Sequence, residues 1–196
     1  RLETMIKELE LKTIKSQINP HFIFNALNSI RALVDEDPKR ARQAITELSN
    51  ILRSSIQVDK VEIASLEKEL DIVKDYLALE YIRFADRLKV VYEVEQNTLS
   101  HQIPPMMLQT LVENAIKHGI TKLPDGGIIK IESKIKGARI SVEVINSGQL
   151  AENFSMGIGL TNLQKRLENL FPENASFHLD NFGNQQVKST LIYPIS

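Results

Sequence analysis

Apolar residues recur at helical spacing over roughly the first third of the chain. Residues 1–58 carry hydrophobic side chains at i, i+3, i+4 and i+7, a pattern that predicts helices and no strands. The stretch VDEDPKR interrupts it, with Asp37 as an expected N-cap and Pro38 at the first position of the next helix. We therefore expect two long helices joined by a short turn.

An antiparallel pair of such helices buries only part of its two apolar stripes. The expected stripes consist of Leu11, Ile14, Ile18, Leu27, Ile30 and Val34 in the first helix, and Ala41, Ala44, Ile45, Leu48, Ile51, Leu52 and Ile56 in the second. A second copy of the chain would cover the remaining apolar surface and close a four-helix bundle. The pattern therefore predicts a homodimer.

Near residue 62 the pattern changes to a mixture of helices and strands. Helices are expected at 65–88, at 104–119 (opened by proline and closed by Gly119) and at 157–171; strands are expected at 89–95, 126–135, 138–148 and twice within 175–196. The predicted fold class is α+β: a helical hairpin in residues 1–60, then, in residues 61–196, helices packed against a mixed, mostly antiparallel sheet.

Composition excludes several functions. Lys and Arg total 24 against 25 Asp and Glu, so the chain lacks the basic excess expected for nucleic-acid binding. It contains no cysteine, which excludes disulfides, zinc–thiolate sites and thiol nucleophiles. No apolar run approaches the roughly 20 residues that span a bilayer, and the charged start RLETMIKELE is no signal peptide. Because that start lacks Met, we expect a segment of a longer protein, with any membrane attachment outside it.

Candidate chemistry begins in the helix expected at 104–119. Asn114, Lys117 and His118 lie at i, i+3 and i+4, so they share one helix face. An amide oxygen beside a cation can bind Mg²⁺ and phosphate oxygens, because Mg²⁺ prefers hard oxygen ligands and retains several waters. The same three residues also suit a solvated polar face, and the helix alone leaves both interpretations open.

Glycines provide a second element of the candidate site. Gly157 and Gly159 open the helix expected at 157–171, whose free N–H groups and positive dipole end suit an anion. By itself a GxG sequence is equally typical of a tight turn. Asn146, Ser147 and Gly148, at the end of the preceding strand, favour the anion site.

This order of asparagine helix, NxG strand end and GxG helix resembles the Bergerat (GHKL) ATP-binding domain of gyrase, MutL and histidine kinases. The resemblance implies ATP and Mg²⁺ as ligands, with Asn114 holding the metal and Asn146 where an aspartate usually accepts from the adenine amino group. The other nucleotide-binding residues it implies are Lys117, His118, Gly148, Gly157, Gly159 and Leu160. An amide oxygen also accepts hydrogen bonds, but the change from Asp puts adenine affinity and selectivity in question. The short segment between Gly148 and Gly157 implies a small lid.

Together with NPHFIFNALNSI at 19–30, these motifs resemble the LytS-type sensor histidine kinases over essentially the whole chain. The resemblance implies that His21 is the phosphoacceptor, attacking the γ-phosphate of ATP as a neutral imidazole. It also implies transfer to an aspartate of a response regulator, of the LytTR DNA-binding type, and a cytoplasmic location as part of a membrane-anchored sensor.

Several residues near His21 have open roles. Pro20 is expected to kink the first helix and expose His21, or else to fit the curvature of the bundle. Gln17 and Asn25 flank His21 on one face; Asn25 orients the imidazole or a water, or belongs to a polar stripe. Phe22 stands where many histidine kinases have a carboxylate, so Glu113 is the best candidate for a base, with a structural role equally open.

Two other functions remain open for the same sequence. A non-catalytic ATP-binding or scaffold module is suggested by Asn146 and the short lid, and a GHKL-type ATPase by the nucleotide motifs alone. Arg166 matches the pattern of the resembled family but also suits a helix surface, whereas His101 and His178 lack partners at ligand spacing.

Overall fold

The computed structural model describes residues 19–57 and 63–195 of the chain. The chain divides into two compact units, one of residues 1–61 with 74–83 and one of residues 62–73 with 84–196. The long helix α4 (Leu66–Phe84) contributes residues to both. Within the described ranges, no helix combines the length and apolar character required to cross a membrane.

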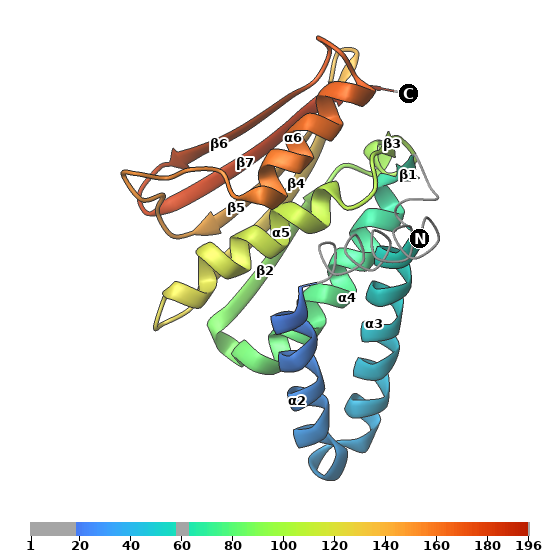
Figure 1. Ribbon diagram of the computed structural model, residues 1–196, viewed down its shortest axis with the longest axis vertical. Helices are drawn as coiled ribbons and strands as arrows, with labels where there is room; N and C mark the ends of the chain where they lie inside the picture. The colour runs from blue at the N-terminus through green and yellow to red at the C-terminus, as the bar shows by residue number, and fades with distance from the viewer. Residues whose placement is uncertain (1–18, 58–62, 196) are drawn as a thin grey trace, which may run out of the picture. The chain divides into compact units, whose positions relative to one another are not determined.

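The first unit contains the predicted helical hairpin. Helices α2 (Pro20–Glu36) and α3 (Pro38–Gln57) pack side by side in opposite directions, joined at Asp37 (Figure 1). The Asp37 carboxylate accepts a hydrogen bond from the Arg40 backbone N–H at 3.0 Å, which caps α3. The predicted cap and the predicted first-position proline of the second helix are both confirmed.

Residues 74–83 of α4 pack against this hairpin, a contact that the helical pattern did not predict. The Phe22 and Tyr76 rings lie 4.6 Å apart, and Arg40 Nη2 donates to the Ala78 carbonyl at 3.0 Å. One apolar face of the hairpin is therefore buried within its own chain. The large apolar side chains that remain exposed on α2 and α3 are Phe24, Leu27, Val34, Ile45 and Ile56.

Pro20 lies at the start of a helix, which corrects the expectation of a kink in a helix interior. Asn19 has extended backbone angles (φ −72°, ψ 107°), and its side chain accepts from the N–H groups of His21 and Phe22. Proline at the first helical position loses no hydrogen bond, since that N–H has no partner within the helix. The cost expected for Pro20 is therefore not incurred. Leu11, Ile14, Gln17 and Ile18 lie outside the described residues.

The second unit is built on a five-stranded sheet in the order β2-β4-β5-β7-β6. Its strands are β2 (Leu88–Val94), β4 (Gly127–Lys136), β5 (Arg139–Ser147), β6 (Ser176–Phe182) and β7 (Gln186–Pro194). Strands β2 and β4 run parallel and the other neighbours run antiparallel, so the predicted mixed, mostly antiparallel sheet is confirmed. A separate two-stranded pair joins β1 (Ala64–Ser65) to β3 (Gln102–Ile103).

Helices α5 (Met107–His118) and α6 (Ile158–Leu170) lie on one face of this sheet (Figure 1). The core beneath them includes the fully buried side chains of Leu108, Leu111, Ile129, Ile131, Ile140, Leu167, Leu191 and Tyr193. On the other face, neighbouring strands carry opposite charges: Lys130 on β4 pairs with Glu93 on β2 at 2.8 Å and with Glu132. Cross-strand ion pairs of this kind suit a sheet face in contact with water.

In the described part of the chain, these elements are connected by the short 3₁₀ helices η2 (Ala85–Arg87), η3 (Gln96–Thr98) and η4 (Ile120–Lys122). Helix α5 begins at Met107, two residues beyond the prolines that were expected to open it. The residue before it, Met106, has φ 66°. That left-handed conformation turns the chain before the helix can begin.

Candidate functional site

His21 lies in the first turn of α2 with its side chain exposed. The next residue, Phe22, is buried against Tyr76, and this contact fixes the helix face that His21 turns to solvent. Asn25, one helical turn further on, places Nδ2 3.3 Å from His21 Nδ1. Of the two polar neighbours expected on this face, Asn25 contacts the imidazole, and Gln17 lies outside the described residues.

Helix α5 carries the residues expected to bind phosphate and metal. Glu113 and Asn114 are partly buried, whereas Lys117 and His118 are exposed in the last turn. Gln109 Nε2 donates to Glu113 Oε1 at 2.8 Å, which fixes the carboxylate from one turn below. Partial burial, with Lys117 and Lys122 nearby, lowers the pKa of His118. His118 is therefore neutral near neutral pH and suits a hydrogen-bonding role better than a cationic one.

The end of β5 meets the end of α5. Asn146 is buried, and its Nδ2 donates to the Ser147 carbonyl at 2.9 Å. Gly119 packs so closely that an added Cβ would lie 2.3 Å from Asn146 Nδ2 and 2.9 Å from the Ser147 oxygen. Gly148, with φ 136°, approaches Gly119 from the other side. The structure thus brings together the asparagine helix and the NSG strand end, which the sequence placed on separate elements.

The two glycines at the start of α6 lie in an exposed segment. Residues 151–159 are exposed, and Gly157 at the N-cap of α6 makes no side-chain capping bond. An added Cβ at Gly157 would meet nothing within 4 Å. Its φ of −71° suits any residue, so neither packing nor backbone conformation requires glycine there. At Gly159 an added Cβ would lie 3.7 Å from Thr110 Cγ2 of α5.

Leu160 differs from the other expected nucleotide-binding residues, because its side chain is buried in the core of the second unit. Any contact of Leu160 with a nucleotide would therefore involve its backbone N–H. That group belongs to the first turn of α6, where helical N–H groups lack partners within the helix.

The donor set fits Mg²⁺ bound through a nucleotide. Within residues 19–57 and 63–195, no group of three or more His, Asp or Glu side chains is arranged to hold a metal ion. Asn114 and Glu113 still offer hard oxygen atoms on adjacent positions of α5, and Mg²⁺ is commonly bound by one or two protein oxygens together with phosphates and waters. The sequence did not single out Glu69, and it did not predict the contact that Arg166 makes near the N-terminal end of α5, described below. In both cases the partners are backbone atoms far away in the chain.

Comparison with known proteins bears on this arrangement. Residues 9–88 match the sequence family described as Histidine kinase. The chain is 33% identical over 191 residues to Sensor protein LytS of Enterococcus faecalis, covering 90% of this chain and 32% of that protein. It is 36% identical over 205 residues to Sensor protein LytS of Staphylococcus saprophyticus, covering 96% and 34%. With Sensor histidine kinase YpdA of Escherichia coli the identity is 37%, over 88% of this chain and 32% of that one.

Over most of its length, the chain is similar to LytS-type sensor histidine kinases. It spans about a third of the length of the curated relatives it matches. This similarity confirms the resemblance drawn from the motifs at 19–30, 104–119 and 157–167.

Solved structures support the fold of this chain. The catalytic domain of histidine kinase ThkA superposes with a TM-score of 0.52 at 20% identity, covering 67% of this chain and 94% of that one. The histidine kinase domain of the Erythrobacter litoralis blue-light activated kinase gives 0.52 at 12% identity, over 100% and 95%. At these identities the likeness concerns the fold alone, and it confirms the predicted α+β class.

Proposed function

We propose that this chain is the catalytic core of a two-component sensor kinase that phosphorylates His21 with ATP. One observation carries the proposal: Gly119, directly after α5, packs against Asn146 of β5 and Gly148 directly after it, which joins the two motifs proposed to bind nucleotide in a chain that also exposes His21. The similarity to histidine kinases supports a kinase, and the identity of the phosphoacceptor and of the ATP-binding residues is our proposal.

In the proposed reaction the unprotonated Nε2 of His21 attacks the γ-phosphorus of ATP. The bond from that phosphorus to its bridging oxygen breaks, ADP leaves with the electron pair, and the ring proton on Nδ1 is later lost. Asn25 can hold the tautomer that this attack needs. With its amide rotated, Oδ1 accepts from Nδ1–H and leaves the lone pair on Nε2, because an amide presents a donor and an acceptor of similar size.

The nucleotide would be held by the residues that line the ends of α5, β5 and α6. Asn146 would accept from the adenine amino group, Lys117 and the first-turn N–H groups of α6 would bind phosphate oxygens, and Gly148, Gly157 and Gly159 would allow close approach. Asn114 would hold Mg²⁺, which when bound neutralises charge on the phosphates. Glu113, fixed by Gln109, is the proposed acceptor of the proton that Nδ1 of His21 loses after phosphoryl transfer.

The proposed partners are a second copy of the chain and a response regulator. The exposed apolar side chains of α2 and α3, which α4 leaves uncovered, provide the surface for a homodimer. One structural neighbour, histidine kinase ThkA, was solved in complex with response regulator protein TrrA (TM-score 0.51, 18% identity, 99% of this chain and 57% of that one). By resemblance, we propose that the response regulator is of LytTR type. We also propose that this chain is the cytoplasmic part of a membrane-anchored sensor.

Incubation with γ-labelled ATP tests the proposal. The chain should acquire an acid-labile, base-stable label, which His21→Gln should abolish without changing ATP affinity. His178→Gln, which alters an exposed histidine on β6, is the matched control and should be labelled normally. ATP binding without label would favour the non-catalytic module that Asn146 suggests, and release of free phosphate without label would favour an ATPase.

A further inference from the structure

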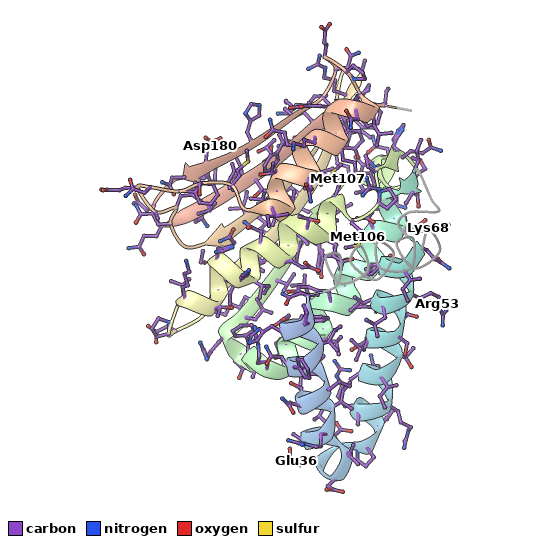
Figure 2. All side chains as sticks on the ribbon, viewed as in Figure 1. Glu36, Arg53, Lys68, Met106, Met107 and Asp180 are labelled. Carbon is purple, nitrogen blue, oxygen red and sulfur yellow. The ribbon has the colours of Figure 1, made fainter. Side chains whose placement is uncertain are left out.

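The N-terminal end of α5 lacks a cap of its own. Met106 occupies the N-cap position with φ 66°, and its side chain makes no capping bond. The first N–H groups of a helix have no partners within the helix and need acceptors from elsewhere. Figure 2 labels Met106 and Met107 at this end, where the chain enters the helix that carries Glu113 and Asn114.

The missing acceptor comes from Glu69, 37 residues earlier in the chain and in the first turn of α4. Glu69 Oε1 accepts the Met106 N–H at 2.8 Å. The N–H groups of Leu108 and Gln109 also stabilise the charge of this carboxylate. Glu69 is 4% exposed, so water does not compete for this contact.

Arg166 holds the same segment from a third element. Its Nη1 donates to the Pro105 carbonyl at 2.7 Å, and its positive charge stabilises the ionised form of Glu69. Within α5, Thr110 Oγ1 donates to the Met106 carbonyl at 2.6 Å. Residues 105 and 106 are therefore positioned by one side chain from α4 and one from α6.

An ionised carboxylate is an expensive cap at this position. Burial raises the pKa of Glu69 to about 7, against the opposing effect of three N–H groups and Arg166. Its Oε2 is buried without a hydrogen-bond partner within the described part of the chain, as is the hydroxyl of Tyr193, whose pKa Glu69 helps to raise. A neutral local cap such as serine would satisfy the helix end at less cost in desolvation.

We propose that Glu69 is a positioning residue for the nucleotide site, fixing the start of α5 so that Glu113 and Asn114 are held ready for phosphate and metal. The inference rests on the proposed binding of ATP along α5. The Glu69 side chain supplies the acceptor for the Met106 N–H, so its removal would leave the start of α5 without this contact from α4. Glu69 supports nucleotide binding through α5 and touches no part of the nucleotide.

The test compares MgATP affinity, measured by calorimetry, for the full chain and three variants between about pH 6 and about pH 8. Relative to the unaltered chain, Glu69→Ala should bind about tenfold more weakly at the higher pH. Glu69→Gln, which resembles the protonated form and keeps an oxygen acceptor for the Met106 N–H, should bind within about twofold of the unaltered chain at both pH values. Taking the ratio of variant to unaltered chain cancels the protonation of ATP itself. Glu67→Ala changes an exposed carboxylate in the same turn and should have no effect.

A second measurement needs no nucleotide. Hydrogen exchange at the backbone amides of Met106 to Gln109 should be faster in Glu69→Ala than in the unaltered chain, and Glu69→Gln, which keeps an acceptor, should not show this increase. Equal MgATP affinities of the unaltered chain and Glu69→Ala would overturn the inference and leave the proposed function standing. If the unaltered chain binds no MgATP, the proposed function itself fails.

Discussion

Asn25 Nδ2 lies 3.3 Å from His21 Nδ1, one turn along α2, so the proposed phosphoacceptor has a partner from its own helix. This contact concerns the ring nitrogen that does not attack in the proposed reaction. The residue that holds one imidazole nitrogen determines which nitrogen carries the proton. Asn25 is therefore the residue through which the tautomer of His21 can be changed without altering the nucleotide site.

Asn25→Leu should slow autophosphorylation about tenfold or more while MgATP affinity stays unchanged, because it removes the partner of Nδ1 and leaves α5 and β5 untouched. Asn25→Asp should retain most of the rate, since a carboxylate accepts from Nδ1–H and keeps Nε2 free. Single-turnover labelling with γ-labelled ATP measures both. Equal rates for the unaltered chain and Asn25→Leu would show that Asn25 is part of a polar helix surface only.

Asn146→Asp should increase the preference for ATP over GTP. A carboxylate can only accept at this position, whereas the amide of Asn146 can present either a donor or an acceptor to a purine. In the structure its Nδ2 donates to Ser147, which leaves Oδ1 as the group that would face adenine. Competition between the two nucleotides for the site, measured before and after the change, tests this. An unchanged ratio would remove Asn146 from base recognition.

Two glycine substitutions separate packing from ligand approach. Gly119→Ala should destabilise the second unit by about 1–3 kcal/mol, since its Cβ would overlap Asn146 and the Ser147 carbonyl. Gly157→Ala should leave the unfolding free energy within about 0.5 kcal/mol, because the added methyl enters open space, and should still weaken MgATP binding. Denaturant unfolding and calorimetry measure the two effects. Normal nucleotide affinity in Gly157→Ala would exclude close approach of a phosphate at that glycine.

The stability of the second unit should depend on Glu69 and pH. The pKa of this carboxyl is about 7 in the folded chain, against 4.5 without burial, so the folded state binds the extra proton between these values. Stability therefore falls as pH rises from about 4.5 through about 7 and is constant above. Glu69→Gln should be more stable than the unaltered chain near pH 8, by on the order of 3 kcal/mol, and similar near pH 5. Thermal unfolding of the two proteins at both pH values measures this difference in stability. A difference that does not change with pH would contradict the cost of burying the ionised carboxylate.

Asn19→Ala should destabilise the first unit by about 1 kcal/mol, because it removes the side-chain cap of α2 beside His21. Pro20→Ala should change stability by less than about 1 kcal/mol, since proline at the first helical position loses no hydrogen bond. A large stabilisation by Pro20→Ala, measured by denaturant unfolding, would restore the view that Pro20 strains a longer helix.

Local pattern was sufficient to predict the elements and the type of sheet, but it did not predict the contacts that join them. The cap at Asp37 and the two strands expected at 126–135 and 138–148 follow from local sequence, and both were predicted correctly. The start of α5 depends on Glu69, which reads locally as a residue in the first turn of its own helix. Likewise, the packing of α4 on the hairpin depends on Tyr76 and Phe22, and helical spacing does not specify a partner.

The candidate site shows the same division. The sequence showed the order of Asn114, Asn146 and the glycines at the start of α6. It did not show which of them lie close together, because the approach of Gly119 to β5 has no local sequence signal. Pro20 was misjudged for a related reason. Apolar spacing continues through residues 11–34, which favours one continuous helix. The start of α2 depends on the side-chain conformation of Asn19, which the spacing of apolar residues does not specify.

The parallel pairing of β2 with β4 affects how the second unit can assemble. Strands β4 and β5 are joined by a tight turn, as are β6 and β7, so these two hairpins close small loops and form early. Strand β2 pairs with β4 only after the segment containing α5 has crossed between them, which makes this a slow, non-local step. Hence the edge of the sheet and the helix proposed to bind Mg²⁺ should reach their native arrangement together, late in folding, and a nascent chain should acquire nucleotide affinity only at that point.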